Sequence, residues 1–529
     1  MIRNGALLLA IIAMSGCSGD APGNGTPGNA ASADVVAEAG ERMYRDGIHV
    51  SGEPMTALVG GDIPIVGTQF SCENCHGRSG MGAAEGPYVV PPVAGQFLFA
   101  PSPQPERPAY DRDSLAVLLR DGITPSGRAL SPELMPRYEI GDADVDVLTA
   151  YLENLSPGNS PGVGDEQSRF ATVVTEGADP DAAAAMLAVL DRYAEDINSQ
   201  TRGERERWDR GYSPESKLPT VFREWVIDEW TLSGPRETWA QQLESYYSEA
   251  PVFALISGTG PGSWQPVSEF CERNKVACLY PSTELPHRND GDFYTVYFSG
   301  GLLLEARLIA AHLAERPVKS VVQVYCDPVY ESVVAELRDS LEDTSSHNVS
   351  FDCDRPLPIE HIDEIAGERS AVVLWVGAKQ LEGVPDAIGA ETLYVSSTLT
   401  DAWPPAGVAG DSDLFMAHPY RLPGKVDPAA RRFRAWAKSR GVEITAPRLQ
   451  AEAYFACLVL KDAVKQMGRF FIREFALDKL DHSESLAAFV PMYEQPSFGP
   501  GQRFISKGGY IVPVVEGQVE TVEAQWLLP

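Results

Sequence analysis

Beyond residue 168, short apolar runs alternate with stretches of helical periodicity, and this alternation constrains the fold more than any other feature. Apolar runs occupy residues 252–257, 320–326 and 371–377, and a helical pattern occupies residues 302–315. Strands that are separated by helices of this length pair in parallel, because each helix carries the chain back along the sheet. The sequence therefore predicts an α/β architecture for this region.

The length and composition of the chain predict more than one domain. At 529 residues it is too long for one ordinary hydrophobic core. A segment rich in Pro, Gly and Ser, LSPGNSPGVGDEQ, starts at Leu155 and is typical of an exposed linker. We therefore predict a smaller domain at residues 34–155, a linker at residues 156–168 and a larger domain at residues 169–529.

The first seventeen residues have the pattern of a processing signal. Arg3 supplies a positive charge, and residues 6–14 form an apolar run that is too short to span a bilayer. The sequence MSGC, which ends at Cys17, resembles a bacterial lipobox. In lipoproteins of that kind the signal is cut before the cysteine and the thiol is diacylated. The alternative is an ordinary secretory signal with an incidental cysteine.

The lipobox resemblance implies a lipoprotein signal peptide at residues 1–17, a lipid on Cys17 and a flexible tether at residues 18–33. No later segment reaches about 18 uninterrupted apolar residues, so a lipid is the only membrane anchor that we predict. We expect the protein in the periplasm, held to a bacterial membrane, or soluble there if the lipid is absent.

A CxxCH sequence formed by Cys72, Cys75 and His76 lies in the smaller domain. Two thiols three residues apart can reach the two vinyl groups on one porphyrin edge, and the histidine then lies under the iron as the proximal ligand. A redox CxxC pair and half of a zinc site are the alternatives. However, the chain has no second CxxC for zinc, and no thioredoxin-like βαβ pattern surrounds this one. We predict one covalently attached haem c.

The residues around this motif resemble those of class I cytochromes c. Gly40 and Tyr44 match the GxxxF/Y pattern of the first helix in that family, and Tyr151 matches the aromatic residue of the last helix, which packs on the glycine. Pro91, in PPVAG, matches the proline whose carbonyl accepts the other N–H of the proximal imidazole. Met135, in LMPRY, matches the distal methionine. The resemblance implies a small all-α domain.

The resemblance makes Met135 the sixth iron ligand, and His49 is the rival, which would give a bis-His haem. With both axial positions filled, electron transfer rather than catalysis is the expected task. Arg128 and Arg137 flank the distal loop and are either partners of a haem propionate or solvated surface residues. The long insertion at residues 45–71 departs from the family and leaves one wall of the haem pocket unassigned.

Several segments of the larger domain occur in the order found in type I periplasmic binding proteins of branched-chain amino-acid transport. They include ALISGTG from Ala254, YPST from Tyr280, AEAYFA from Ala451 and SFGPGQRF from Ser497. The resemblance implies an α/β fold of two lobes with a small molecule bound between them, at the carboxyl ends of parallel strands.

Hydroxyl groups at the ends of the predicted strands are the candidate ligand-binding residues. Such groups, together with backbone N–H groups at helix N-termini, suit an anion such as a carboxylate. The alternative is that they are ordinary helix N-caps. We find no counter-ion for an amino group, which leaves ligands other than amino acids open. The resemblance implies that the residues that bind the carboxylate, which we call the ligand grip, are Ser257, Thr259, Ser282 and Thr283. It places Tyr330 and Tyr420 opposite them, on the second lobe.

Five cysteines lie in the larger domain. In an oxidising compartment four of them can pair, but the sequence leaves the connectivity among Cys271, Cys278, Cys326 and Cys353 open. Cys457 lies in an apolar helical pattern and is expected to be a buried free thiol.

Composition and motifs exclude several classes of function. The formal net charge of −31 disfavours nucleic acid as a partner, because phosphate binding needs a basic surface. The chain has no GxSxG, HExxH or P-loop sequence, and we expect no enzymatic activity of its own. Our main hypothesis is a periplasmic electron carrier, alone or as a subunit of a dehydrogenase system, whose binding domain senses or recruits a small organic solute or a redox partner such as a dehydrogenase. The alternatives are a solute receptor for ABC-type uptake or signalling with an accessory haem, and a scaffold that binds no solute.

Overall fold

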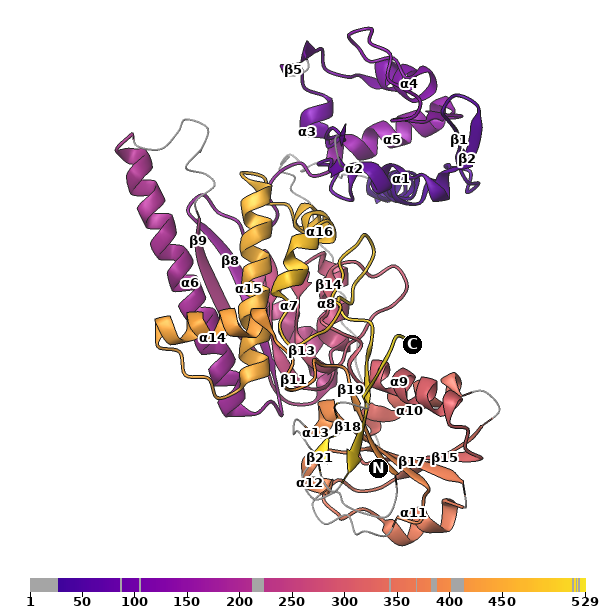
Figure 1. Ribbon diagram of the computed structural model, residues 1–529. Helices are drawn as coiled ribbons and strands as arrows, with labels where there is room; N and C mark the ends of the chain where they lie inside the picture. Colours follow the sequence, from indigo (N-terminus) through magenta and orange to yellow (C-terminus); the bar gives the residue numbers. More distant parts are fainter. Residues whose placement is uncertain are drawn as a thin grey trace, which may run out of the picture. The chain divides into compact units, whose positions relative to one another are not determined.

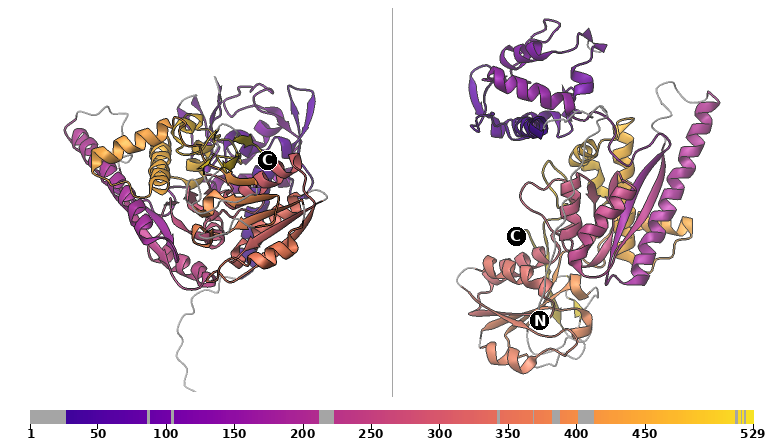
Figure 2. Two further views of the ribbon diagram at one scale, coloured as in Figure 1. Left: turned by 60° about the horizontal axis from the view of Figure 1, so that its bottom comes forward. Right: turned by 180° about the vertical axis from the view of Figure 1, so that it is seen from behind.

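A computed structural model describes residues 27–85, 88–103, 106–211, 223–341, 344–367, 369–381, 388–400, 413–515, 518–519, 521 and 524–529 (Figures 1 and 2). The predicted signal peptide and Cys17 lie outside the described residues. The chain divides into two compact units. The first comprises the described residues up to Asn74 together with Gly95–Leu155, and the second comprises Cys75–Ala94 and Ser156–Pro529.

The first unit is mainly helical. Its helices are α1 Pro27–Asp46, α3 Gly95–Leu98, α4 Arg112–Asp121 and α5 Asp142–Asn154, and α2 Cys72–His76 begins in it. The predicted flexible tether extends to residue 33, but α1 already begins at Pro27, so residues 27–33 are helical and not part of a tether. The stretch that follows Pro27 is rich in alanine, which favours helix over a flexible chain.

The first and last helices of this unit cross at a glycine. A Cβ atom on Gly40 of α1 would collide with the Cβ of Tyr151 on α5, so only glycine permits this approach. The rings of Tyr44 and Tyr151 pack next to the crossing, with centroids 5.5 Å apart.

The insertion before the CxxCH motif forms a β-hairpin. Strands β1 Thr56–Val59 and β2 Ile63–Val66 pair in antiparallel register, and β1 also pairs with β7 Arg137–Tyr138. Gly60 and Gly61, both with positive φ, form the turn, as expected for a tight hairpin. The prediction of an all-α unit is therefore incomplete, because these strands, together with the two-residue strands β5 Ser102–Pro103 and β6 Glu106–Arg107, lie within it.

The second unit contains two large sheets, each covered by helices, as the alternating pattern predicted (Figure 1), and a short strand pair, β3 Ala84–Glu85 with β4 Tyr88–Val89. The first sheet is entirely parallel, with strand order β13-β11-β8-β10-β12-β14 and β9 paired with β8. Its strands are β8 Gln167–Thr175, β9 Glu224–Leu232, β10 Ala254–Ile256, β11 Thr259–Ser263, β12 Ala277–Leu279, β13 Ser282–Leu285 and β14 Thr295–Val296. Its helices are α6 Pro180–Asp209, α7 Trp239–Glu249, α8 Gln265–Asn274, α14 Pro428–Arg440, α15 Pro447–Met467 and α16 Arg473–Asp481.

The second sheet has strand order β16-β15-β17-β18-β19-β20-β21, with β22 paired with β20. Its first five strands are parallel, and β20 pairs antiparallel with β19. The strands are β15 Ser320–Tyr325, β16 Ser345–Ser350, β17 Ser370–Trp375, β18 Thr392–Ser396, β19 Asp413–His418, β20 Gly509–Val515, β21 Gln518–Val519 and β22 Gln525–Leu527. Its helices are α9 Gly301–Glu315, α10 Glu331–Ser340, α11 Ile359–Ile365, α12 Ala378–Leu381 and α13 Ser397–Thr400. Each sheet with its helices forms one lobe, the first sheet the first lobe and the second sheet the second lobe. The chain enters the second lobe at α9, returns to the first at α14 and re-enters the second at β20.

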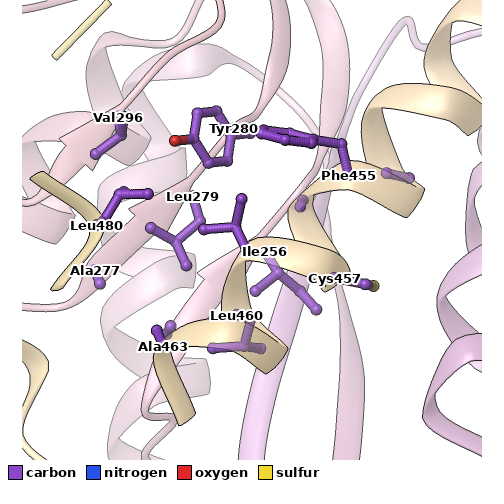
Figure 3. Close-up of a cluster of buried hydrophobic side chains, with 14 of the residues drawn as sticks. Ile256, Ala277, Leu279, Tyr280, Val296, Phe455, Cys457, Leu460, Ala463 and Leu480 are labelled. Atoms are coloured by element: carbon purple, nitrogen blue, oxygen red, sulfur yellow. The ribbon is translucent and has the colours of Figure 1, made fainter. Parts of the chain in front are cut away.

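Helix α15 is held to the first sheet by buried apolar side chains. Figure 3 shows Phe455, Cys457 and Leu460 of this helix beside Ile256 and Leu279 of β10 and β12. Burial of each large side chain contributes about 1.5–3 kcal/mol, so this contact fixes the returning helices on the first lobe. Burial also raises the pKa of the Cys457 thiol, and Cys457 forms no disulfide, as predicted.

One disulfide bond is present among the described residues, between Cys326 at the end of β15 and Cys353 after β16. Cys271 and Cys278 are buried and not disulfide-bonded. Among the residues that the structure describes, no helix is long and apolar enough to cross a membrane.

Candidate functional site

The CxxCH motif forms the five-residue helix α2 Cys72–His76. Residues three apart in a helix lie on the same face, so the Cys72 and Cys75 thiols face the same side, and both residues are half-buried. Within the described part of the chain, no cluster of three or more His, Cys, Asp or Glu is arranged to hold a metal ion.

The ring of His76 is oriented by the carbonyl of Pro91. Nδ1 of His76 lies 2.9 Å from the Pro91 oxygen, and because a carbonyl can only accept, Nδ1 must carry the proton. Nε2 is then the nitrogen with a lone pair for a metal. Burial lowers the pKa of His76, which favours the neutral imidazole that a metal requires.

The loop that carries Met135 is held by backbone and side-chain contacts of the first unit. The guanidinium of Arg137 donates to the carbonyls of Met135, at 2.6 Å, and of Leu130. Arg137 belongs to β7, which pairs with β1 of the inserted hairpin, so the hairpin is connected to the Met135 loop.

His49, the rival ligand, is bonded elsewhere. Its Nδ1 lies 3.1 Å from a carboxylate oxygen of Asp144, and the other oxygen of Asp144 accepts the N–H of Val50. This arrangement ties the start of the insertion to the first turn of α5.

Together these residues fit a c-type haem. The thiols lie on one face of a helix, the imidazole is neutral with its tautomer set, and a thioether side chain is available in a backbone loop of defined structure. Sequence reasoning anticipated all of these groups but not the hairpin, which lacks a strong alternating pattern.

A second candidate site lies between the two lobes of the second unit. A small cavity of about 10 Å³ is enclosed there, which is room for about one water molecule. Three of the candidate ligand-binding residues line it, namely Ser282 and Thr283 of the first lobe and Tyr420. Residues that the sequence did not single out also line it, among them Tyr297, Ser299, Arg448 and Tyr493.

The cavity walls are tied together by polar contacts. The Thr283 hydroxyl donates to the Gly262 carbonyl at 3.1 Å, and the hydroxyls of Tyr420 and Thr398 lie 3.2 Å apart. Burial raises the pKa of Tyr420 to about 12, so its phenol stays protonated at neutral pH. The phenol of Tyr493 donates to the buried carboxylate of Glu452 at 2.9 Å.

Arg448 brings a cation to the cavity. Its guanidinium lies 5.1 Å from the centre of the Tyr420 ring and 3.8 Å from a carboxylate oxygen of Glu452. The residue lies in the first turn of α15, three positions before the AEAYFA segment, and nothing in its local sequence distinguishes it from a surface arginine.

Three of the candidate ligand-binding residues lie outside the cavity lining. Ser257 has a positive φ of 55° and is 1% exposed, and its hydroxyl donates to the sulfur of Met186 at 3.3 Å. Thr259 pairs with Ser282 across neighbouring strands but is not part of the lining. Tyr330 instead bridges the lobes, because its phenol donates to Glu284 of β13 at 3.1 Å.

Residues 67–156 match the family model for cytochrome c. No curated protein matches the chain.

Three solved structures of binding proteins are similar to part of the chain. A leucine-binding protein from Thermotoga maritima is 12% identical, with 68% of this chain and 99% of that chain covered and a TM-score of 0.48. A branched-chain amino-acid binding protein from Streptococcus pneumoniae, solved with isoleucine, is 12% identical, with 69% and 100% covered and a TM-score of 0.49. A fatty-acid transporter binding protein from Thermomonospora curvata is 16% identical, with 70% and 95% covered and a TM-score of 0.45.

Proposed function

We propose that this protein is a periplasmic electron carrier with one haem c, and that its second unit binds a small solute or a redox partner such as a dehydrogenase. The contact between His76 and Pro91 carries the proposal, because it leaves Nε2 of a neutral imidazole for the iron directly after the two cysteines. When bound, the haem supplies an iron that alternates between the ferric and ferrous states.

The chain's own residues have distinct tasks in this proposal. Cys72 and Cys75 would hold the haem through thioether bonds, and His76 and Met135 would bind its iron. A thioether sulfur favours the ferrous state and raises the potential, as suits an electron carrier. The bonds of Arg137 to the Met135 and Leu130 carbonyls support a role for Arg137 in holding the loop that carries Met135.

For the second unit we propose an anionic solute such as a small organic acid. Arg448 supplies a positive charge, and Ser282 and Thr283 supply hydroxyl donors on the wall of the same cavity. A cavity of about 10 Å³ admits no organic molecule, so binding requires the lobes to separate first.

The small cavity also favours a second candidate function, the scaffold that binds no solute. Tyr420, Arg448 and Tyr493 fill the space between the lobes and are bonded to Thr398 and Glu452. If these contacts are permanent, the second unit serves as an interface for a redox partner.

Replacement of both cysteines, Cys72→Ala with Cys75→Ala, tests the proposed haem attachment. The wild-type chain, matured in a host with a cytochrome c assembly system, is expected to keep haem on a denaturing gel, and the double variant is expected to lose it. Cys457→Ala is the control, because that thiol is buried in the second unit. Haem stain that survives in the double variant would contradict the assignment.

A further inference from the structure

The turn that follows the proximal ligand is held by a carboxylate from a distant part of the second unit. Asp478, on α16, accepts the backbone N–H groups of Arg78 at 3.1 Å and Ser79 at 3.0 Å. It also accepts the Ser79 hydroxyl at 2.6 Å. These residues are 399 and 400 positions apart in the chain, so the contact is a product of the tertiary fold.

The turn is shaped to receive this carboxylate. Gly77 has a φ of 74°, and a Cβ atom at Gly77 would lie 2.7 Å from an oxygen of Asp478. A side chain at position 77 would therefore displace the carboxylate, and glycine is also the residue that adopts this φ without strain. Ser79 is fully buried, and its hydroxyl also accepts the N–H of Met81 at 3.2 Å.

A short chain of hydrogen bonds connects this turn to the carbonyl that orients His76. The Gly80 carbonyl, directly after Ser79, accepts the N–H groups of Val93 at 2.7 Å and Ala94 at 2.9 Å. These two residues follow Pro91 closely, so the position of Gly80 sets the position of the Pro91 carbonyl. That carbonyl lies 2.9 Å from Nδ1 of His76.

The helix that carries Asp478 is itself held at both ends. Arg473 in its first turn is buried and donates to the carbonyls of Phe253 at 2.8 Å and Val252 at 2.6 Å. At its other end the two carboxylate oxygens of Asp481 accept hydrogen bonds from two guanidinium nitrogens of Arg503, at 2.8 and 3.0 Å, and both side chains are buried. The helix therefore presents Asp478 from a fixed position.

A cation–π contact adds a second attachment of the same turn. The guanidinium of Arg78 lies 4.1 Å from the centre of the Phe293 ring, and that of Arg503 lies 4.5 Å from it. Such contacts contribute about 0.5–2 kcal/mol each. The residues after His76 are thus fixed by α16 and by the segment before β14.

We propose that Asp478 is a positioning residue for the proximal haem ligand, which it holds through Ser79, Gly80 and the Pro91 carbonyl, and that it thereby sets the reduction potential. This inference rests on the proposed haem attachment. The Nδ1–H bond to Pro91 gives the imidazole more negative character, which stabilises ferric iron. A looser turn weakens that bond, and a weaker bond raises the potential.

The test compares three variants of the full-length haem protein. Asp478→Asn removes the charge and leaves Ser79 with a poorer acceptor, since a carboxamide nitrogen cannot accept. Ser79→Ala removes the two bonds of the hydroxyl, to Asp478 and from the Met81 N–H, and keeps both backbone bonds to Asp478. Asp462→Asn is the matched control, because this carboxylate on α15 bonds to Gln466 of its own helix. The measurements are the midpoint potential, the electron paramagnetic resonance of the ferric haem and hydrogen exchange of residues 77–82.

We expect Asp478→Asn to raise the midpoint potential, Ser79→Ala to raise it less, and Asp462→Asn to leave it at the wild-type value. The resonance spectrum is expected to change in the same order, because it reports the orientation of the axial ligands. Faster hydrogen exchange at residues 77–82 with an unchanged potential would overturn the proposal, since Asp478 would then only stabilise the turn. If Asp478→Asn fails to fold, an unchanged potential in Ser79→Ala overturns it. Wild-type protein without covalent haem would instead refute the proposed function, and this inference with it.

Discussion

The carboxylate of Glu305 accepts two hydrogen bonds from Thr398, one from its backbone N–H at 3.1 Å and one from its hydroxyl at 2.7 Å. Glu305 lies on α9 and is fully buried, while Thr398 lies in α13 at the carboxyl end of β18. Burial raises the pKa of Glu305 to about 7 despite these bonds. A protonated acid is therefore accommodated inside the second lobe at mildly acidic pH.

This carboxyl predicts a specific pH dependence of stability. An unfolded Glu has a pKa of 4.5. Between about pH 4.5 and about pH 7 the folded state thus binds more protons than the unfolded state, and the free energy of unfolding falls as the pH rises through this window. We expect Glu305 to contribute a fall of about 1–3 kcal/mol. Glu305→Gln should flatten the curve in urea unfolding at about pH 5, 6, 7 and 8.

Glu360→Gln serves as the control for this prediction, because Glu360 is exposed in the first turn of α11. This variant should retain the wild-type slope. A slope that is the same in Glu305→Gln and in wild type would show that Glu305 does not titrate in this window.

Loss of the ion pair between Arg503 and Asp481 should strongly lower the free energy of unfolding. Both side chains are buried, and removal of the arginine leaves an uncompensated carboxylate. We expect Arg503→Met to lower the free energy of unfolding by about 3–5 kcal/mol. Arg273 and Glu244 form an exposed pair at 3.0 Å, and Arg273→Met should cost only about 0–1 kcal/mol. Denaturant unfolding of both variants measures the difference, and equal losses would contradict the assigned role of burial.

The haem attachment and the strands could be predicted from the local sequence, whereas the residues that line the interlobe cavity could not. The CxxCH spacing places both thiols on one helix face by geometry alone, and the run at residues 371–377 is apolar enough to require burial on both faces of a sheet. These features depend on neighbours in the chain.

The residues that the sequence did not reveal depend on distant parts of the chain. The positive φ of Ser257 turns its hydroxyl toward Met186, 71 positions away, and the neighbouring sequence does not predict that conformation. Arg448 reaches the cavity only because the chain returns to the first lobe at α14 and α15, after strands β15 to β19 of the second sheet. Asp478 is likewise an ordinary helix residue until the fold places it beside Ser79.

Replacement of the proposed distal ligand should change the spectrum of the haem in a defined way. Met135→Ala is expected to abolish the sulfur-to-iron charge-transfer band of the ferric haem and to lower the midpoint potential, because thioether ligation favours the ferrous state. His49→Ala and Met81→Ala should retain the band. Loss of the band in either of those variants, or its survival in Met135→Ala, would assign the sixth ligand to another residue.

The proposed lipid anchor can be tested at Cys17. Without a thiol to acylate, Cys17→Ser should remove the chain from the membrane fraction, provided that another peptidase still cuts the signal. Fractionation after a high-salt wash, with Cys457→Ala as the control, measures the outcome. A Cys17→Ser protein that stays with the membrane would require a different means of attachment.

The interlobe cavity makes the last prediction. If Arg448, Ser282 and Thr283 grip an organic acid, a thermal shift screen of the full chain against acids, amino acids, alcohols and sugars should find acids that stabilise the second unit. Stabilisation rises with ligand concentration and reaches about 2.7 kcal/mol at a hundred times the dissociation constant.

Because the Thr283 hydroxyl also bonds to Gly262, Thr283→Ala lowers stability even without ligand. The informative quantity is therefore the shift that ligand adds. Thr283→Ala should weaken binding by about 1–3 kcal/mol, and Arg448→Gln should weaken it for acids but not for neutral compounds. Thr259→Ala, on the neighbouring strand and outside the lining, should bind as wild type does. A screen without any stabilising compound would favour the scaffold, in which Tyr420 and Tyr493 close the cavity permanently.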